Sequence, residues 1–125
     1  MPEDIAAMTA QKEDDVWTPI CEVDELPVEH GVTALVRGQA IAIFLTAGGE
    51  VYAIGNHDPF SRVGTLGHGI VGVRGDVPFV FSSHGRRGFD LRTGQCLHDA
   101  SVTVPTYAVR IVDGVVNVGP RGGGA

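Results

Sequence analysis

Short apolar runs separated by turn residues dominate the chain from Val16 onward, and this spacing predicts strands rather than helices. The run Ala40–Thr46 is almost wholly apolar, which predicts a strand that is covered on both faces. Asp113-Gly114 separates two such runs and is the strongest hairpin signal in the sequence. The pattern predicts an all-β fold of antiparallel strands, as a sandwich or partly open barrel. The expected strands are Val16–Cys21, Gly31–Arg37, Ala40–Thr46, Val51–Gly55, Phe79–Phe81, Phe89–Leu91, Ser101–Val104, Thr106–Val112 and Val115–Val118.

Glycine and proline predict how these strands are bounded. Pro19 lacks a backbone N–H and so restricts the first strand to a sheet edge or a bulge. Glu22–Pro27 is expected to form one helical turn that ends at its proline. Ala47–Glu50 is expected to be a hairpin turn. The glycine-rich segment Gly64–Gly75 is expected to be a long, tightly turning connection without an element of its own.

The 125 residues are expected to form one domain. Residues 1–15 are polar and acidic and predict a flexible leader, 16–119 form the domain, and 120–125 are expected to be a disordered tail. No apolar run reaches the ~20 residues of a membrane span, and the N-terminus lacks the pattern of a secretory signal, so we expect no membrane association and a cytoplasmic location. Cys21 and Cys96 are then expected to be reduced thiols.

Charge is distributed unevenly along the chain. The net charge is −6, which argues against a nucleic-acid partner because phosphate contacts supply most of such affinity. The acidic excess lies in the first 30 residues, where Lys12 is the single lysine or arginine. Arginines are frequent between residues 62 and 92, and arginine is enriched at protein interfaces. These arginines are Arg62, Arg74, Arg86, Arg87 and Arg92.

Two segments of the chain resemble the cluster-binding regions of Rieske iron–sulfur domains. The first is Tyr52-Ala53-Ile54-Gly55-Asn56-His57-Asp58-Pro59-Phe60, and the second is Gly88-Phe89-Asp90-Leu91-Arg92-Thr93-Gly94-Gln95-Cys96. A Rieske [2Fe–2S] centre has two cysteine and two histidine ligands. The resemblance places them as Cys-x-His in a first loop and Cys-x-x-His in a second, and it implies a Rieske-like fold with two hairpin loops at one end.

At the ligand positions of these loops, this sequence mostly has residues other than the expected cysteines and histidines. By the resemblance, Asp58 stands at the first cysteine position and Phe60 at the first histidine position. In the second loop, counting from Phe89 puts Ser82 at the cysteine position and Gly85 at the histidine position. Counting from His84 keeps a histidine but puts Phe81 where cysteine is needed. At most one ligand of four remains, so we expect no iron–sulfur cluster and no other metal or cofactor in this chain.

The combination of motifs resembles the small subunit of bacterial NAD(P)H-dependent nitrite reductase. Asn56-x-Asp58-Pro59-Phe60 is followed in order by Leu66-x-x-Gly69-Ile70-Val71-Gly72, Phe89-x-Leu91-x-x-Gly94-x-Cys96 and Tyr107-x-Val109-Arg110-x-x-Asp113-Gly114. The resemblance implies a noncatalytic subunit of an assimilatory enzyme. Its large partner would carry FAD, an iron–sulfur cluster and sirohaem and would pass electrons from NAD(P)H to nitrite, forming ammonium.

Three expectations concern single side chains of the loops. Arg62, Arg86 and Arg87 are candidates for contact with the partner, although a solvated loop surface is as good a reading of them. Phe60 is expected to be partly buried, filling the volume that a cluster would take. Asp58 before Pro59 is typical of a turn in which the carboxyl group accepts a backbone N–H.

Other functions explain the sequence less well. A metal site of His57, Asp58 and His84 matches no known ligand spacing, and no serine or cysteine has the context of a catalytic nucleophile. No glycine-rich loop joins a strand to a helix as a dinucleotide site requires. The alternatives left open are a Rieske-type ferredoxin serving an oxygenase, which would need a cluster, and a free-standing binding domain with an unrelated partner.

Overall fold

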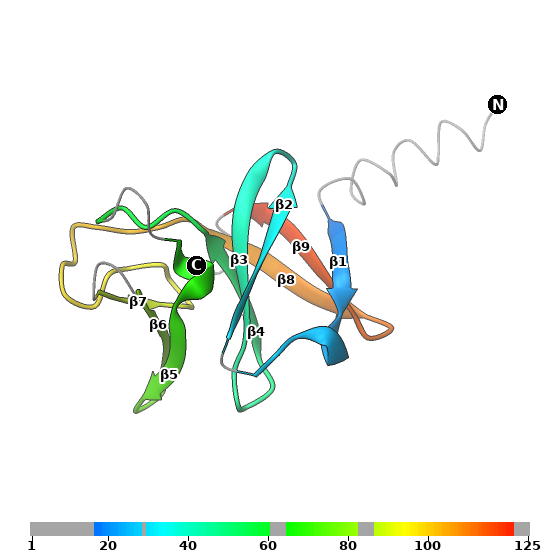
Figure 1. Ribbon diagram of the computed structural model, residues 1–125, viewed down its shortest axis with the longest axis horizontal. Helices are drawn as coiled ribbons and strands as arrows, with labels where there is room; N and C mark the ends of the chain where they lie inside the picture. Colours follow the sequence, from blue (N-terminus) through cyan, green and yellow to red (C-terminus); the bar gives the residue numbers. More distant parts are fainter. Residues whose placement is uncertain (1–16, 29, 61–64, 83–86, 122–125) are drawn as a thin grey trace.

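The fold consists of strands and short turns, which confirms the all-β prediction (Figure 1). The computed structural model describes residues 17–28, 30–60, 65–82 and 87–121, so the expected leader, Arg62, His84, Gly85 and Arg86 lie outside the described residues. The elements are β1 (Thr18–Glu22), the 3₁₀ turn η1 (Val23–Glu25), β2 (Gly31–Val36), β3 (Gln39–Leu45), β4 (Val51–Gly55), the 3₁₀ turn η2 (Leu66–His68), β5 (Ile70–Arg74), β6 (Val77–Phe81), β7 (Gly88–Asp90), β8 (Thr106–Val112) and β9 (Val115–Arg121).

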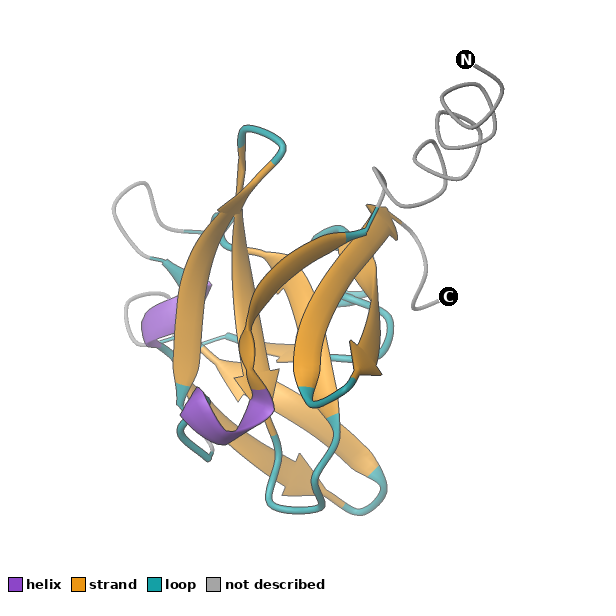
Figure 2. Cartoon of the chain, turned by 90° about the vertical axis from the view of Figure 1, so that its right-hand side faces the viewer, coloured by secondary structure: helices purple, strands orange, loops and turns teal. Residues whose placement is uncertain are grey.

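Two antiparallel sheets make up the molecule. The larger has the strand order β1-β9-β8-β4-β3-β2, and the smaller has the order β5-β6-β7. Figure 2 shows the larger sheet curling round toward its own far edge. Arg37, in the turn after β2, donates hydrogen bonds to the Gly119 carbonyl of β9 at 2.8 Å and to Thr18 Oγ1 of β1 at 3.1 Å. These bonds connect the two ends of the sheet, so the partly open barrel is confirmed.

β3 is the strand that both hydrophobic cores share. Ile41 and Ile43 point into the barrel interior, and Ala42 and Phe44 point into the core between the barrel and the small sheet. All four side chains are fully buried. Since successive side chains of a strand face opposite ways, a strand with both faces covered must be apolar at every position. The prediction of a strand that is covered on both faces is confirmed.

The turn and edge predictions are also confirmed. β1 lies at the edge of the large sheet, and its register with β9 shifts between Pro19 and Cys21, as a bulge does. The helical turn η1 ends before Pro27. Asp113 and Gly114 both have positive φ, 52° and 79°, which is the geometry of a tight hairpin turn whose twist matches its strands. β9 continues to Arg121, two residues into the segment that was expected to be a tail.

Two elements differ from the sequence prediction. The segment Gly64–Gly75 was expected to lack an element, but it contains η2 and β5. Gly72 sits within β5 because the Phe79 ring of the neighbouring strand covers it, and a Cβ there would lie 2.8 Å from that ring. The strand expected at Ser101–Val104 does not form. In its place, Thr103 makes an isolated β-bridge with Gln95.

The turn at Asp99 explains why that strand is missing. The Asp99 carboxyl group accepts hydrogen bonds from the Ser101 backbone N–H at 3.0 Å and the Ser101 hydroxyl at 2.6 Å. The Val102 N–H donates to the Asp99 carbonyl at 3.0 Å. A local turn of this kind satisfies backbone groups that a strand ladder would otherwise use. Among the described residues, no helix is long and apolar enough to cross a membrane.

Candidate functional site

The two loops that the sequence singled out meet at one end of the small sheet. The first follows β4 and runs through Asn56, Asp58 and Phe60, and the second lies between Ser82 at the end of β6 and Gly88 at the start of β7. Asn56 fixes the base of the first loop. Its side-chain oxygen accepts the Gly67 N–H at 2.8 Å, and its backbone N–H donates to the Ala40 carbonyl at 3.1 Å.

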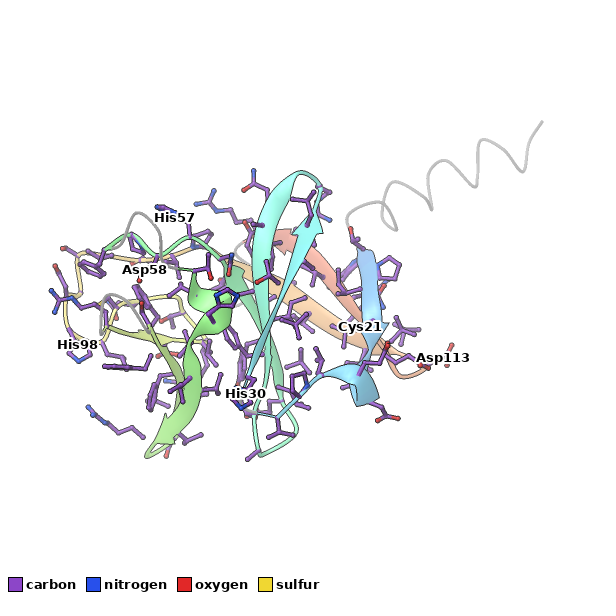
Figure 3. All side chains as sticks on the ribbon, viewed as in Figure 1. Cys21, His30, His57, Asp58, His98 and Asp113 are labelled. Atoms are coloured by element: carbon purple, nitrogen blue, oxygen red, sulfur yellow. The ribbon has the colours of Figure 1, made fainter. Side chains whose placement is uncertain are left out.

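Asp58 joins the two loops by hydrogen bonds. Its side chain is fully buried, and Figure 3 labels it in the loop that follows β4. One carboxyl oxygen, Oδ1, accepts the Phe60 backbone N–H at 2.9 Å, which confirms the predicted turn. The other, Oδ2, accepts the Ser82 hydroxyl of the second loop, and Ser82 is itself buried. The Ser82 backbone N–H then donates to the Arg87 carbonyl across the loop at 2.8 Å.

Phe60 and Arg87 stack on each other above this hydrogen-bonded pair. The Phe60 ring is half-buried and packs against the fully buried Phe89, with 6.1 Å between ring centroids, so its predicted partial burial is confirmed. The guanidinium carbon of Arg87 lies 4.8 Å from the Phe60 centroid, within the range of a cation–π contact. Sequence reasoning named both residues but gave no sign that they touch.

The donor set at this end does not fit a [2Fe–2S] cluster. Phe60 has no lone pair to give a metal, and Ser82 offers a hydroxyl in place of a thiolate. Both oxygens of Asp58 are engaged by protein donors. The part of the chain that the structure describes contains no group of three His, Cys, Asp or Glu side chains able to hold a metal ion.

The histidines and cysteines take structural positions in the described ranges. His57 is exposed and forms a backbone bridge with Thr65, and its postulated co-ligand His84 lies outside the described residues. His98 Nδ1 accepts the Gly88 N–H at 3.2 Å, and its ring meets the edge of Phe81, so this surface residue also supports β7. Cys21 and Cys96 are free thiols.

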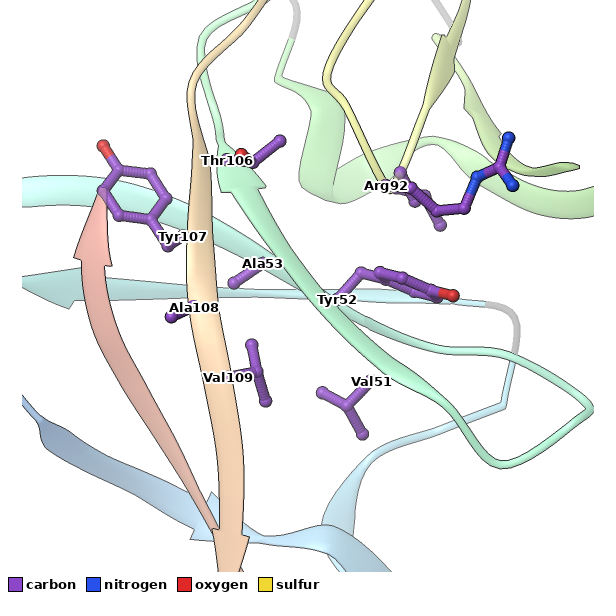
Figure 4. Close-up of a pocket in the computed structure, with 9 residues that line it drawn as sticks. Val51, Tyr52, Ala53, Arg92, Thr106, Tyr107, Ala108 and Val109 are labelled. Carbon is purple, nitrogen blue, oxygen red and sulfur yellow. The ribbon is translucent and has the colours of Figure 1, made fainter. Parts of the chain in front are cut away.

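Sequence reasoning missed an open cavity between β4 and β8. These strands share two residue pairs, Ala53 with Tyr107 and Ile54 with Thr106. Beyond these pairs lies a cavity of about 380 Å³ that has Tyr52 and Arg92 at its rim (Figure 4). Its lining contains no Ser–His or Cys–His pair, so it offers no nucleophilic site.

Arg92 also stabilises the start of the loop after β7. Burial raises the pKa of the Asp90 carboxyl group, but hydrogen bonds from the Arg92 side chain and backbone, together with the guanidinium charge, outweigh burial and hold that pKa below its ordinary value. The Arg92 backbone N–H donates at 2.8 Å, and its guanidinium group donates twice at 3.2 Å.

The lowered pKa predicts a pH dependence. A carboxyl group whose pKa is lower in the folded state stabilises the fold above its unfolded-state pKa, and this stabilisation is lost as the pH falls through the folded-state value. Asp90→Asn should therefore lower the free energy of unfolding at about pH 7 by more than at about pH 2.5. Urea unfolding at both pH values measures this difference. An equal loss at both would show that the charge of Asp90 contributes nothing.

Comparison with known proteins shows one family throughout. The model of the Rieske-like [2Fe–2S] domain matches residues 16–119. The nitrite reductase (NADH) small subunit of Escherichia coli K12 is 34% identical over 103 residues, which are 82% of this chain and 95% of that protein. The nitrite reductase [NAD(P)H] large subunit of Klebsiella oxytoca is 32% identical over 103 residues, which are 82% of this chain but 11% of that protein.

Solved structures agree with these matches. A Mycobacterium tuberculosis protein described as an NADH-dependent nitrite reductase small subunit has a TM-score of 0.80 and 39% identity, covering 84% of this chain and 95% of its own. The E. coli protein NirD has a TM-score of 0.75 and 35% identity, covering 86% and 96%. The ferredoxin of carbazole 1,9a-dioxygenase from Nocardioides aromaticivorans shares the fold, with a TM-score of 0.71 at 23% identity and coverage of 82% and 98%.

Proposed function

This chain belongs to the Rieske-like [2Fe–2S] domain family and, within it, to the small subunits of NAD(P)H-dependent nitrite reductase, and from this membership we propose that it is the noncatalytic small subunit of such an enzyme. Its role is to bind the large subunit and support the reduction of nitrite to ammonium. The large subunit supplies NAD(P)H binding, FAD, an iron–sulfur cluster and sirohaem. The complex acts in the cytoplasm and needs no membrane or nucleic acid.

One observation carries the proposed partnership. In the large subunit of K. oxytoca, a segment that makes up 11% of the protein is similar to this chain. There the two kinds of domain belong to one polypeptide, which holds them at high effective concentration. A separate small chain with the same fold reaches the same arrangement by binding. The hydrogen-bonded loop end supports this assignment, because Asp58, Phe60 and Ser82 contact one another in place of holding a redox centre.

Co-purification tests the partnership. The tagged chain, expressed in its native host under growth on nitrate, is expected to retain the host's nitrite reductase large subunit, identified by mass spectrometry. NAD(P)H-dependent nitrite reduction should be present in the eluted complex and absent from the isolated small chain. Failure to retain the large subunit, with the tagged chain folded and expressed, would contradict the proposal.

Iron content separates this function from the alternative, a Rieske-type ferredoxin of an oxygenase. An electron carrier of that type would contain about two iron and two acid-labile sulfide atoms per chain and would be brown. The isolated chain prepared from the native host under anaerobic conditions is expected to be colourless and to contain neither in stoichiometric amount. Finding both at stoichiometry would support the ferredoxin.

A further inference from the structure

We propose that Arg87, stacked on Phe60, binds a carboxylate of the large subunit, and that the Asp58–Ser82 hydrogen bond fixes the relative position of the two loops that carry these residues. The proposal rests on the proposed function and names the chemistry by which the partner is recognised. Arg62 and Arg86, the other candidate arginines, lie outside the described residues. Among the described residues, the proposed site includes four, Asp58 and Phe60 from the first loop and Ser82 and Arg87 from the second.

The four residues form a closed circuit of contacts. Asp58 accepts the Phe60 N–H and the Ser82 hydroxyl. The Ser82 N–H donates to the Arg87 carbonyl at 2.8 Å, and the Arg87 guanidinium group returns to the Phe60 ring at 4.8 Å. These hydrogen bonds and the ring contact therefore hold the two loops in position relative to each other. In a Rieske domain the metal ligands of the two loops have this connecting role, and here hydrogen bonds and one stacking contact replace them.

Arg87 is available to a partner. It is exposed, and among the described residues no carboxyl oxygen lies within ion-pair distance of its guanidinium group, whereas Arg92 is paired with Asp90 at 3.2 Å. A guanidinium group that lies on a ring keeps the N–H groups at its edge free, in the planar fork that matches a carboxylate with two parallel hydrogen bonds. Lysine, with a compact ammonium group, cannot reproduce this arrangement.

The circuit prepares Arg87 for binding. A flexible arginine loses rotamer freedom when a partner fixes it, and this loss weakens association. Before the partner arrives, the Phe60 ring restrains the Arg87 side chain, and the hydrogen bond from the Ser82 N–H to the Arg87 carbonyl fixes the backbone that carries it. Restraint of this kind raises affinity without adding a contact. The same reasoning makes Phe60, Ser82 and Asp58 positioning residues, since none of them needs to touch the carboxylate.

Asp99 is the charged neighbour of Arg87 that works against binding. Hydrogen bonds from the Ser101 side chain and backbone hold the pKa of Asp99 below its ordinary value, and the positive charge of Arg87 lowers it further. The Leu97 N–H donates to the Gly88 carbonyl at 2.7 Å. The segment that leads to the exposed Asp99 therefore lies beside the residue that follows Arg87. An incoming carboxylate meets some repulsion from Asp99, and removing that charge should tighten the complex.

Affinity measurements with the host's large subunit test the proposal. Titration calorimetry at low and physiological salt should give a Kd roughly tenfold or more higher for both Arg87→Ala and Arg87→Lys than for the wild type. Ser82→Ala should weaken binding by about three- to tenfold through looser positioning. Asp99→Asn should bind about twofold tighter at low salt, with the gain reduced at high salt.

Arg110 provides a matched control. It makes the same kind of contact, with its guanidinium carbon 4.3 Å from the Trp17 ring, but it belongs to β8 of the large sheet and to neither loop (Figure 1). Arg110→Ala and Arg110→Lys should bind within about twofold of the wild type. If the Arg110 variants weaken binding as much as the Arg87 variants, the loss is a general effect of removing a stacked arginine. If neither set weakens binding, Arg87 does not contribute to it. Either result would show that the assignment to Arg87 is wrong.

Cross-linking identifies the carboxylate directly. A carbodiimide joins a lysine amine to a carboxylate as an amide, and the carboxylate oxygen leaves with the reagent as a urea. The Arg87→Lys complex, formed at concentrations above its Kd, should yield a cross-link from that position to an aspartate or glutamate of the large subunit, and Arg110→Lys should not. If the wild-type chain binds the large subunit and Arg87→Ala binds it with the same affinity, this inference is wrong and the proposed function is unaffected. If the wild-type chain does not bind the large subunit, both this inference and the proposed function are contradicted.

Discussion

Asp58→Ala is expected to lower the free energy of unfolding by about 3 kcal/mol, because the buried Ser82 hydroxyl and the partly buried Phe60 N–H both lose this acceptor. The Phe60 N–H and the Ser82 hydroxyl both donate to this side chain, which is fully buried, so water cannot take its place without opening the loops. Removing the acceptor of a buried donor costs about 1–3 kcal/mol. Urea unfolding followed by intrinsic fluorescence or circular dichroism measures the change.

Two further variants define the origin of this loss. Asp99 is the matched control, since its carboxyl group also accepts two hydrogen bonds, both from Ser101, but it is exposed. Asp99→Ala should therefore cause a much smaller loss than Asp58→Ala. The Asp58→Ala/Ser82→Ala double variant should be less destabilised than the sum of its single variants, because both singles break the same bond. Strict additivity would show that Asp58 and Ser82 do not interact.

Phe89→Ala is expected to lower the free energy of unfolding by about 3–5 kcal/mol. Phe89 is fully buried in the core between the barrel and the small sheet, where it pairs with Val80 of β6 and supports the Phe60 ring. Truncation removes the buried ring and leaves a cavity at the point where the two loops join the core. Chemical denaturation of the purified variant measures the loss.

Neighbouring substitutions check that reasoning. Phe89→Leu retains most of the buried apolar surface and should cost less than about half as much. Phe81→Ala alters a phenylalanine of the neighbouring strand that is 37% exposed, and its effect should also be well below that of Phe89→Ala. If Phe89→Ala and Phe81→Ala were equally destabilised, burial in the core between the barrel and the small sheet would not explain the role of Phe89.

The sequence predicted the elements whose signal is local. The run at Ile41–Phe44 predicted a strand with two covered faces, Pro19 predicted an edge, and Asp113-Gly114 predicted the hairpin turn. Each depends on the conformation or burial of a few adjacent residues. β5 was missed because its glycine reads as a loop signal until the covering ring of Phe79 is known.

The site was predicted in its residues but not in its contacts. Asp58, Phe60, Ser82 and Arg87 were all singled out, and the two loops were expected at one end of the domain. The hydrogen bond from Ser82 to Asp58 spans 24 residues, so no local pattern reports it. A usable signal did exist: an acceptor and a donor occupy the two positions where Rieske loops have cysteine. The cavity between β4 and β8 left no such signal, because it depends on how few residues of these two strands pair with each other.

The connection between the loops also has a consequence for how the protein is made. The contact between Asp58 and Ser82, which holds the two loops together, is made entirely within the polypeptide. It matures as the polypeptide folds, without waiting for iron and sulfide delivery by dedicated carrier proteins. The two loops are thus held together by side chains and backbone groups of the same polypeptide, and this connection forms in the same step as the rest of the fold.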